Sequence, residues 1–287
     1  MRIKDDMTYD DLGLVQPEGG SEVGERSRLG SNKRKIPNPK ELKGFELIDK
    51  HSGEKFTFSS TDELNKFKYQ RYIKRYLSTI ASIDESVGQL LDYLDDQGLA
   101  ENTLVIYTSD QGFFLGEHGW FDKRFIYNES FKTPLLISWP RKIDPGIRIS
   151  KMVQNLDFAQ TFLDAAGINQ PIDMQGESLM PLLLGKEEVW NREAVYYHYY
   201  EYPAVHMVKR HYGIVTENYK LAHFYYDIDE WELFDRLADP MEMKNVYDDS
   251  SYTEIVKTLK TQLTELRKLY KDSRELDLYY IKEYLNN

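Results

Sequence analysis

A short apolar run that ends abruptly in polar residues limits the folds open to this chain. Leu104–Tyr107 shows no polar alternation, which predicts a strand buried on both faces of a parallel sheet. Asp110 and Gln111 follow with two oxygen donors, and Gly112 allows the backbone to turn away. Ligands collect where such strands end, and hard cations prefer oxygen donors. The run therefore indicates a metal site at a sheet edge, although a turn or helix cap is the simpler interpretation of Asp-Gln-Gly alone.

An alternation of helix and strand surrounds this run. Apolar residues recur at three- and four-residue spacing from Thr61 to Gln97, which predicts one long helix that Gly98 ends. The positions that carry this pattern are Ile73, Leu77, Ile80, Val87, Leu90, Leu91 and Leu94. We expect strands at Thr103–Asp110 and Pro134–Trp139, then a helix over Asn155–Ala166 with Asn155 as its N-cap and Gly167 as its stop. This order is typical of an α/β layer.

The two ends of the chain differ from this middle part. Residues 1–60 are rich in Gly, Pro, Ser and charge and lack periodicity, so we expect loops. A basic cluster there, Lys33–Lys35, is interpreted as solvated surface. After Trp190, aromatic and β-branched runs separated by turn residues predict a small antiparallel sheet, and Ser251–Lys271 predicts one helix that covers it.

Composition excludes several classes of function. The 287 residues include 37 basic and 48 acidic ones, and this balance of −11 argues against general nucleic-acid or anionic-membrane binding. Because cysteine is absent, disulfides, thiolate nucleophiles and thiolate zinc sites are excluded. No apolar run approaches the roughly 18 residues of a membrane span, and the first ten residues do not resemble a signal peptide.

Several motifs together carry a resemblance to a known family. The segment TSDQGFFLGEHGWFDKRFIYNESFKTPLLISWP resembles the second half of a type I, formylglycine-dependent sulfatase. Further pieces agree in order, namely KYQRYIKRYLSTIASIDESVGQLLDYLDDQGL, NLDFAQTFLDAAG, MQGESLMPLL, HYGIVTENYKLAHFY and WELFDRLADP. The resemblance runs from about Lys66 to the C-terminus. The run from YYHYYEYP to HMVKRHYG is most similar to bacterial enzymes that remove 6-O-sulfate from N-acetylglucosamine in glycosaminoglycans or mucins.

The resemblance implies a fold and a division of the chain. We expect an α/β, alkaline-phosphatase/sulfatase-like sandwich with its N-terminal part incomplete, followed by a small C-terminal α+β subdomain of antiparallel sheet plus helix. Residues 1–188 would be the C-terminal portion of the catalytic domain, with 1–60 rich in loops, and residues 189–287 the subdomain. Periplasmic or extracellular location is the expectation for a full-length bacterial relative.

The chain departs from the family in its nucleophile. Sulfatases carry a C/S-x-P-x-R motif whose Cys or Ser becomes formylglycine, and this chain has no cysteine. Its nearest serine version begins at Ser138 but has Lys142 where arginine is required. An early strand ending in paired metal-binding aspartates is also missing, which is typical of a chain that begins in mid-domain. We therefore expect negligible activity unless the missing N-terminal half is supplied.

By resemblance, the remaining site residues can be assigned. Asp110 and Gln111 correspond to Ca²⁺ ligands, although Gln replaces the family's usual Asn or His and its longer side chain alters the reach. Lys123 corresponds to a catalytic lysine that contacts the sulfate, and the competing interpretation is a surface lysine beside Arg124. His118 either binds substrate or satisfies a loop backbone.

A basic and aromatic cluster near the C-terminal sheet is the last candidate. It comprises His198, His206, Lys209, Arg210 and His211. Strand alternation would spread these side chains over different faces, which argues against a zinc site. We expect substrate-binding roles for His206, Lys209, Arg210 and His211 in a sugar-sulfate pocket, with ordinary edge-strand residues as the alternative.

The expected partner is therefore a sulfated glycan substrate. A noncatalytic sulfated-glycan-binding module is one alternative function, and a phosphatase or phosphotransferase of the alkaline-phosphatase superfamily is another.

Overall fold

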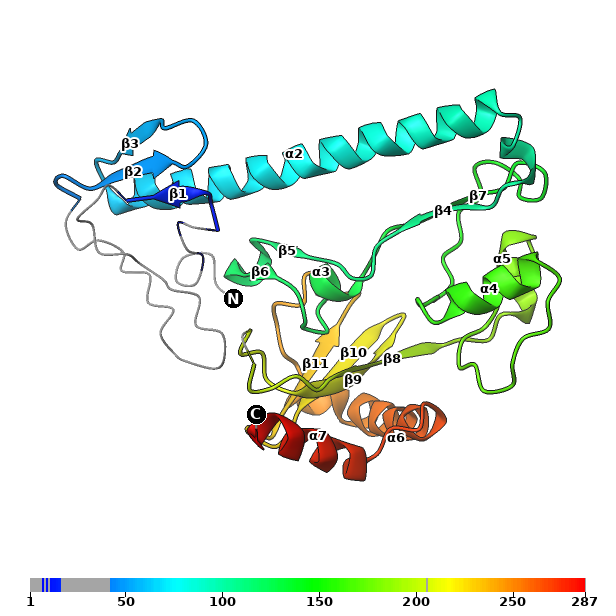
Figure 1. The fold of residues 1–287 in the computed structure, drawn as a ribbon. Coiled ribbons are helices and arrows are strands. Elements are labelled where there is room, and N and C mark those ends of the chain that lie inside the picture. Colours follow the sequence, from blue (N-terminus) through cyan, green and yellow to red (C-terminus); the bar gives the residue numbers. More distant parts are fainter. Residues whose placement is uncertain (1–6, 8, 10, 17–41, 205, 287) are drawn as a thin grey trace. The chain divides into compact units, whose positions relative to one another are not determined.

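The computed structural model describes residues 7, 9, 11–16, 42–204 and 206–286, so Lys33–Lys35 lies outside the described residues. The chain forms two compact units (Figure 1). Unit 1 comprises Met1–Gln97, Phe113–Lys123 and Pro203–Met207, and unit 2 comprises Gly98–Gly112, Arg124–Tyr202 and Val208–Asn287. The predicted division at residue 188 stays a prediction.

Unit 1 is built from a small sheet, a long helix and a hairpin. Its antiparallel sheet has the order β1-β2-β3, with β1 at Leu14–Val15, β2 at Glu46–Asp49 and β3 at Lys55–Thr57. Strands β5 (Phe114–Leu115) and β6 (Phe121–Asp122) form the hairpin. The core is apolar, with Met7, Tyr9, Leu12, Leu14, Leu47, Phe58 and Leu64 buried. The sheet was not predicted, because strands of two to four residues give almost no period-two signal.

Helix α2 confirms the strongest helix prediction. It spans Thr61–Asp96, its N-cap Ser60 accepts from the backbone N–H of Glu63, and Gly98 follows at φ +64°. Its predicted apolar face is largely uncovered within the described residues, since Leu77 is 55% and Leu90 53% exposed. The exposed positions also include Ile80, Ile83, Leu91 and Tyr93.

The first part of unit 2 contains the predicted strands in an unexpected arrangement. Strand β4 (Val105–Thr108) pairs with β7 (Leu135–Ser138) in an antiparallel two-stranded sheet. The expectation of a parallel strand buried on both faces is therefore wrong for the described residues. The connection between these strands holds only the one-turn helix α3 (Asn128–Phe131) and the β5–β6 hairpin, so the chain reverses without a crossover helix.

Helix α4 confirms a prediction in position but not in its cap. It spans Asp157–Ala165, and Gly167 follows at φ +69° as predicted. Asn155 is not the N-cap. Instead the buried Asp157 carboxylate accepts from the backbone N–H groups of Gln154 and Glu177, at 2.8 and 2.9 Å, and pairs with Arg192. A carboxylate inside the first turn has replaced the usual cap.

The C-terminal part of unit 2 is a four-stranded antiparallel sheet of order β11-β10-β9-β8. The strands are β8 (Ala194–Tyr199), β9 (His211–Thr216), β10 (Tyr219–Phe224) and β11 (Glu230–Asp235). Helices α6 (Thr253–Leu269) and α7 (Arg274–Asn286) lie on one face of it (Figure 1). The sheet and α6 were predicted, whereas α7 was not.

The two faces of this sheet have separate cores. Ile214 and Leu221 pack with Leu259 and Leu263 of α6. Their neighbours in sequence, Val215 and Ala222, face the other way and pack with Ile126 and Phe224. The remaining short elements are α5 (Met180–Leu183) and the 3₁₀ turns Ala100–Asn102, Glu117–Gly119, Glu187–Val189 and Ser250–Tyr252. No described helix has the length and apolar character needed to span a bilayer.

Candidate active site

The turn after β4 presents the predicted metal-binding oxygens. Asp110 is exposed and Gln111 partly buried, and the Ser109 hydroxyl lies 2.9 Å from the Gln111 carbonyl oxygen. The Gly112 N–H donates to the Ser130 carbonyl at 2.8 Å. A Cβ at position 112 would lie 2.1 Å from the Glu129 carbonyl oxygen, so only glycine permits this approach. The turn is held in place, with two hard oxygen donors at consecutive positions.

Lys123 belongs to a small charged cluster in unit 1. Its Nζ lies 3.8 Å from Oδ1 of Asp122, whose other oxygen is 3.3 Å from Nδ1 of His206. Lys123 Nζ also lies 5.8 Å from the centre of the Phe113 ring. Lys123 is 30% exposed, so its ammonium group is oriented by a carboxylate yet open to solvent. Sequence reasoning missed Asp122, although a carboxylate beside the lysine was visible in the sequence.

His118 lies on the connection between β5 and β6. It adopts φ +55°, its ring stacks on Trp120 at 5.4 Å between ring centres, and its edge contacts Phe114. The left-handed backbone is uncommon for a residue with a side chain and marks a locally constrained turn. These contacts orient the imidazole but do not choose between its two predicted roles.

His211 is fully buried in unit 2. Its Nδ1 donates to the Lys209 carbonyl at 2.8 Å, and its Nε2 accepts from the Ile126 N–H at 3.2 Å. The ring stacks on Phe224, and burial lowers the pKa of His211 to about 4. Both nitrogens are therefore engaged by the backbone of the chain. The predicted hydrogen bond from this side chain to a sugar does not fit this arrangement.

The segment after Lys123 is fastened to the C-terminal sheet at further points. Lys220 Nζ donates to the Ile126 carbonyl and the Asn128 side chain, at 2.8 and 3.0 Å, and pairs with buried Glu242 at 2.6 Å. The Tyr197 hydroxyl donates to the Arg124 carbonyl at 2.5 Å. Residues 124–128 thus have a fixed course, and His211 is one of their anchors.

Arg210 and Lys209 are held by aromatic rings. Arg210 is buried, pairs with Asp227 at 3.0 Å and lies 5.4 Å from the centre of the Tyr202 ring. Lys209 Nζ lies 4.0 Å from the same ring centre and donates to the Tyr202 hydroxyl. Lys209 is the more accessible cation, because Arg210 has no exposed side-chain surface.

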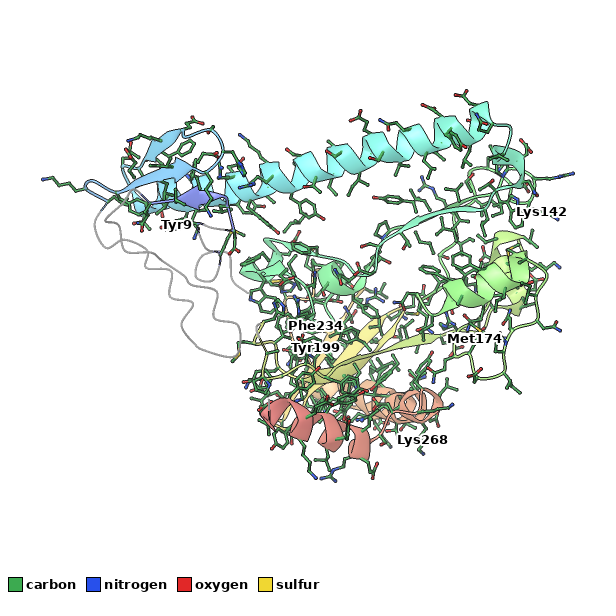
Figure 2. The ribbon with its side chains drawn as sticks, viewed as in Figure 1. Tyr9, Lys142, Met174, Tyr199, Phe234 and Lys268 are labelled. Carbon is green, nitrogen blue, oxygen red and sulfur yellow. The ribbon has the colours of Figure 1, made fainter. Side chains whose placement is uncertain are left out.

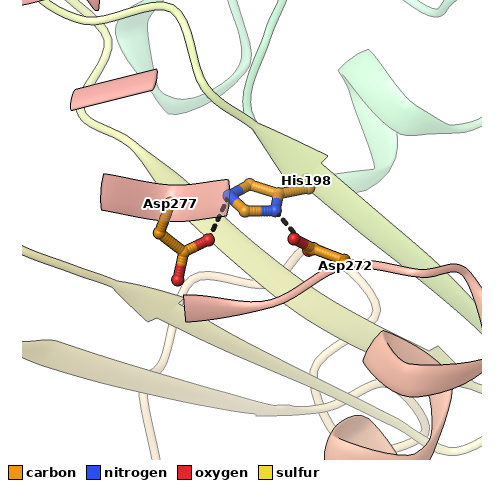
Figure 3. Close-up of side chains that lie close together, drawn as sticks. All are labelled: His198, Asp272 and Asp277. Carbon is orange, nitrogen blue, oxygen red and sulfur yellow. Dashed lines mark hydrogen bonds and ion pairs between the residues drawn. The ribbon is translucent and has the colours of Figure 1, made fainter. Parts of the chain in front are cut away.

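His198 faces the opposite side of the sheet from His211. Figure 3 shows its contacts with Asp272 and Asp277. The Nδ1 atom lies 2.7 Å from Asp272 and the Nε2 atom 3.8 Å from Asp277. The three donor groups lie within 4.8 Å of one another, a spacing that could hold a metal ion. However, Arg267 already lies 2.8 Å from Asp277 and 3.5 Å from Asp272. A guanidinium supplies the positive charge here, so the cluster is a buried ion-pair network rather than a metal centre.

The predicted residues are thus distributed over both units. Lys123, His118 and His206 belong to unit 1, whereas Asp110, Gln111, Lys209, Arg210 and His211 belong to unit 2. The structure brings Lys123 and His206 together through Asp122, and the pairing of β8 with β9 places His198 and His211 on opposite faces of the sheet. The separation confirms that strand alternation spreads the C-terminal histidines over different faces.

Comparisons with known proteins place these features in context. The family model described as "N-sulphoglucosamine sulphohydrolase, C-terminal" matches residues 116–269, and the model described as "Sulfatase" matches residues 31–168. An N-acetylglucosamine-6-O-sulfatase of Bacteroides thetaiotaomicron is 53% identical over 212 residues, which are 73% of this chain and 38% of the relative. Arylsulfatase K of Xenopus laevis is 32% identical over 220 residues, which are 74% of this chain and 40% of the relative.

A solved structure is also similar to this chain in sequence and fold. It shows a protein in complex with its substrate D-glucosamine-2-N,6-O-disulfate and is 52% identical, with a TM-score of 0.72 over 74% of this chain and 43% of that protein. The chain spans about two fifths of the length of the curated relatives it matches.

Proposed function

Because the chain belongs to the sulfatase family and matches its C-terminal portion, we propose that it forms part of a hydrolase that removes 6-O-sulfate from glucosamine units of glycans. The observation that carries this proposal is the cluster of Lys123, Asp122 and His206, in which a carboxylate orients a solvent-open ammonium. A relative 53% identical bears the name N-acetylglucosamine-6-O-sulfatase, and a similar solved protein binds a glucosamine carrying 6-O-sulfate.

The chain's own residues would act by binding and orienting the sulfate. Lys123 would contact a sulfate oxygen and stabilise the charge that develops as the S–O bond breaks. Asp122 would hold the ammonium group in place, and His206 shares that carboxylate. His118, on the connection between β5 and β6, is also assigned a substrate contact.

Asp110 and Gln111 would supply oxygen ligands to Ca²⁺, and the fixed turn at Gly112 suits this role. When bound, the cation would neutralise negative charge on the sulfate.

Most residues of the C-terminal cluster would hold neighbouring parts of the chain in place and would not contact the substrate. We assign Lys209 a contact with the anionic sugar, since its ammonium is the accessible one. Arg210 and His211 are assigned positioning roles, because both are buried and engaged by the chain. His211 would act through Ile126, three residues beyond Lys123.

The nucleophile is assigned to the part of the relatives that this chain does not span. The chain contains no cysteine, and its nearest serine motif lacks the arginine. We therefore expect the chain alone to bind sulfated glucosamine without hydrolysing it. A fusion with the remaining N-terminal part of the similar N-acetylglucosamine-6-O-sulfatase is expected to restore turnover.

The test combines binding with turnover. D-glucosamine-2-N,6-O-disulfate is titrated into the chain by calorimetry, and Lys123→Ala is expected to weaken binding about tenfold because a charge-assisted hydrogen bond is lost. In the fusion, Lys123→Ala is expected to lower kcat about 10²-fold or more. Lys55→Ala is the matched control, since Lys55 is an exposed cation of unit 1 paired with Glu46.

Other outcomes would favour a different function. A folded fusion that hydrolyses aryl phosphate but not aryl sulfate would contradict the sulfatase assignment and support the phosphatase alternative. Binding without turnover in the fusion would favour a noncatalytic glycan-binding module. If Lys55→Ala and Lys123→Ala lowered binding and turnover equally, Lys123 would have no special role.

A further inference from the structure

A basic pocket lies on the face of the C-terminal sheet that α6 covers. It has a volume of about 440 Å³, and four cationic side chains contribute to its wall. These cations are Lys260, Arg267, Lys268 and Arg274, and the aromatic lining residues are Tyr212 and Trp231. None of the residues assigned above to sulfate hydrolysis lines this pocket.

Two of the cations are held in fixed positions by aromatic groups. Lys260 Nζ lies 4.0 Å from the centre of the Trp231 ring and donates to the Tyr247 hydroxyl at 2.6 Å. The Arg267 guanidinium lies 4.0 Å from the centre of the Tyr212 ring. Such contacts favour cations and limit their rotamer freedom, so less conformational entropy is lost when an anion binds.

The pocket remains positive although one carboxylate, Asp272, belongs to its lining. The Asp272 carboxylate is directed at His198 and Tyr196 and lies 3.5 Å from Arg267. Burial alone would raise the pKa of Asp272, but the hydrogen bonds from His198 and Tyr196 lower it to about 2. Its charge is therefore compensated inside the protein. The Arg267 guanidinium is compensated as well, because it pairs with Asp277 at 2.8 Å, so the net positive charge of the wall comes from Lys260, Lys268 and Arg274. Lys268, on α6 (Figure 2), and Arg274 are exposed and form no ion pair among the described residues.

The residues that line the pocket limit the classes of ligand that it can bind. The Trp231 ring is already stacked on His223, at 4.1 Å between ring centres, as well as covered by Lys260, so it offers little surface to a planar base. Thr264 and Ser273 add hydroxyl groups. Fixed cations with neighbouring hydroxyls suit an oxyanion carried on a polyhydroxylated ligand.

We propose that this pocket binds a sulfate group of a sulfated saccharide chain. The proposal goes beyond the hydrolytic function. The site is argued from the geometry of unit 2, and the choice of a sulfated ligand rests on the proposed function. It gives the protein a second point of attachment for a polysulfated glycan. Binding there would increase the effective concentration of the glycan at the proposed hydrolytic site.

Binding of a sulfated heparin hexasaccharide to the full chain tests the proposal. Titration is followed by the fluorescence of tryptophan and by the amide resonances of Thr264 and Lys268, at low salt because exposed charges are screened. The double variant Lys268→Ala/Arg274→Ala is expected to bind about tenfold more weakly, since two charged contacts are lost. Lys260→Met, which keeps the packing on Trp231 without the charge, is expected to weaken binding in the same direction.

Matched controls make the result decisive. Lys257 lies on α6 but outside the pocket and is 77% exposed, so Lys257→Ala should bind as the unaltered chain does. The amide resonances of Thr264 and Lys268 report on the pocket itself, which separates the outcome from that of the proposed hydrolytic site.

Three results would overturn the proposal. The first is equal binding of the desulfated hexasaccharide, and the second is an equal effect of Lys257→Ala and the double variant. The third is saturation of the same resonances by inorganic sulfate at lower concentration than by the hexasaccharide, which would identify the free anion as the occupant.

Discussion

His211 illustrates how one side chain can be chemically suited to a role that its surroundings exclude. The sequence places it in a basic, aromatic run, which favours contact with an anionic sugar. In the structure its nitrogens hold the Lys209 carbonyl and the Ile126 N–H, and its ring is fully buried. A residue's identity in sequence could not reveal these partners, because Ile126 is 85 residues away.

The burial of His211 predicts a pH dependence of stability. An unfolded histidine titrates near pH 6.5, and the pKa of His211 is lowered to about 4 in the folded protein, first of all by burial. Between these values the unfolded state binds a proton that the folded state does not, so the free energy of unfolding falls as pH decreases from 6.5 to 4. The contribution lost is about 3 kcal/mol.

Urea unfolding at several pH values measures this effect. His211→Phe is expected to flatten the pH dependence, while losing about 1–3 kcal/mol at pH 7 through two unpaired backbone groups. His51→Gln is the control, because His51 lies exposed between β2 and β3. An unchanged slope in His211→Phe would show that His211 is not the titrating group.

At the scale of elements, the sequence predicts those helices and strands whose apolar residues form a clear pattern. The long repeat of α2, the apolar runs of β4 and β7 and the pattern of α6 are all confirmed. The sheet of β1–β3 was missed because its strands are too short, and α7 because its apolar residues do not form a single stripe. Pairing direction was predicted wrongly for β4, since side-chain pattern does not fix the direction of the neighbouring strand.

Helix α2 allows burial to be separated from helix propensity. Leu64 is completely buried in the unit 1 core, whereas Leu90 on the same helix is 53% exposed. Leu64→Ala is expected to lower the free energy of unfolding by about 3 kcal/mol, and Leu90→Ala by less than about 0.5 kcal/mol. Chemical denaturation of both variants gives the comparison, and similar losses would mean that Leu90 is covered in solution.

At the scale of the whole molecule, the fold class predicted by resemblance is confirmed. The solved sulfatase relatives share this fold, and the antiparallel C-terminal sheet with its covering helix is present. The roles of Asp110, Gln111 and Lys123 stay predictions. Their spacing in the sequence identifies them. Asp122 is adjacent to Lys123 in the sequence, but the approach of His206 to its carboxylate is evident only in the structure.

Two compact units predict two unfolding transitions. Leu64→Ala should lower the transition of unit 1, and Leu221→Ala, at a fully buried position of unit 2, should lower the other. Native-state hydrogen exchange resolves the two sets of amides. If either substitution accelerates exchange equally in both sets, the units unfold as one.

The path of the chain between the units has a practical consequence for protein engineering. Unit 1 consists of three separate stretches, and two of them, Phe113–Lys123 and Pro203–Met207, are flanked on both sides by unit 2. A single cut anywhere in the backbone therefore cannot release either unit intact. A version that ends between residues 97 and 124 would lack most of unit 2 and also the Pro203–Met207 stretch of unit 1, so both units would be incomplete. Limited proteolysis is therefore expected to yield nicked chains rather than separable domains.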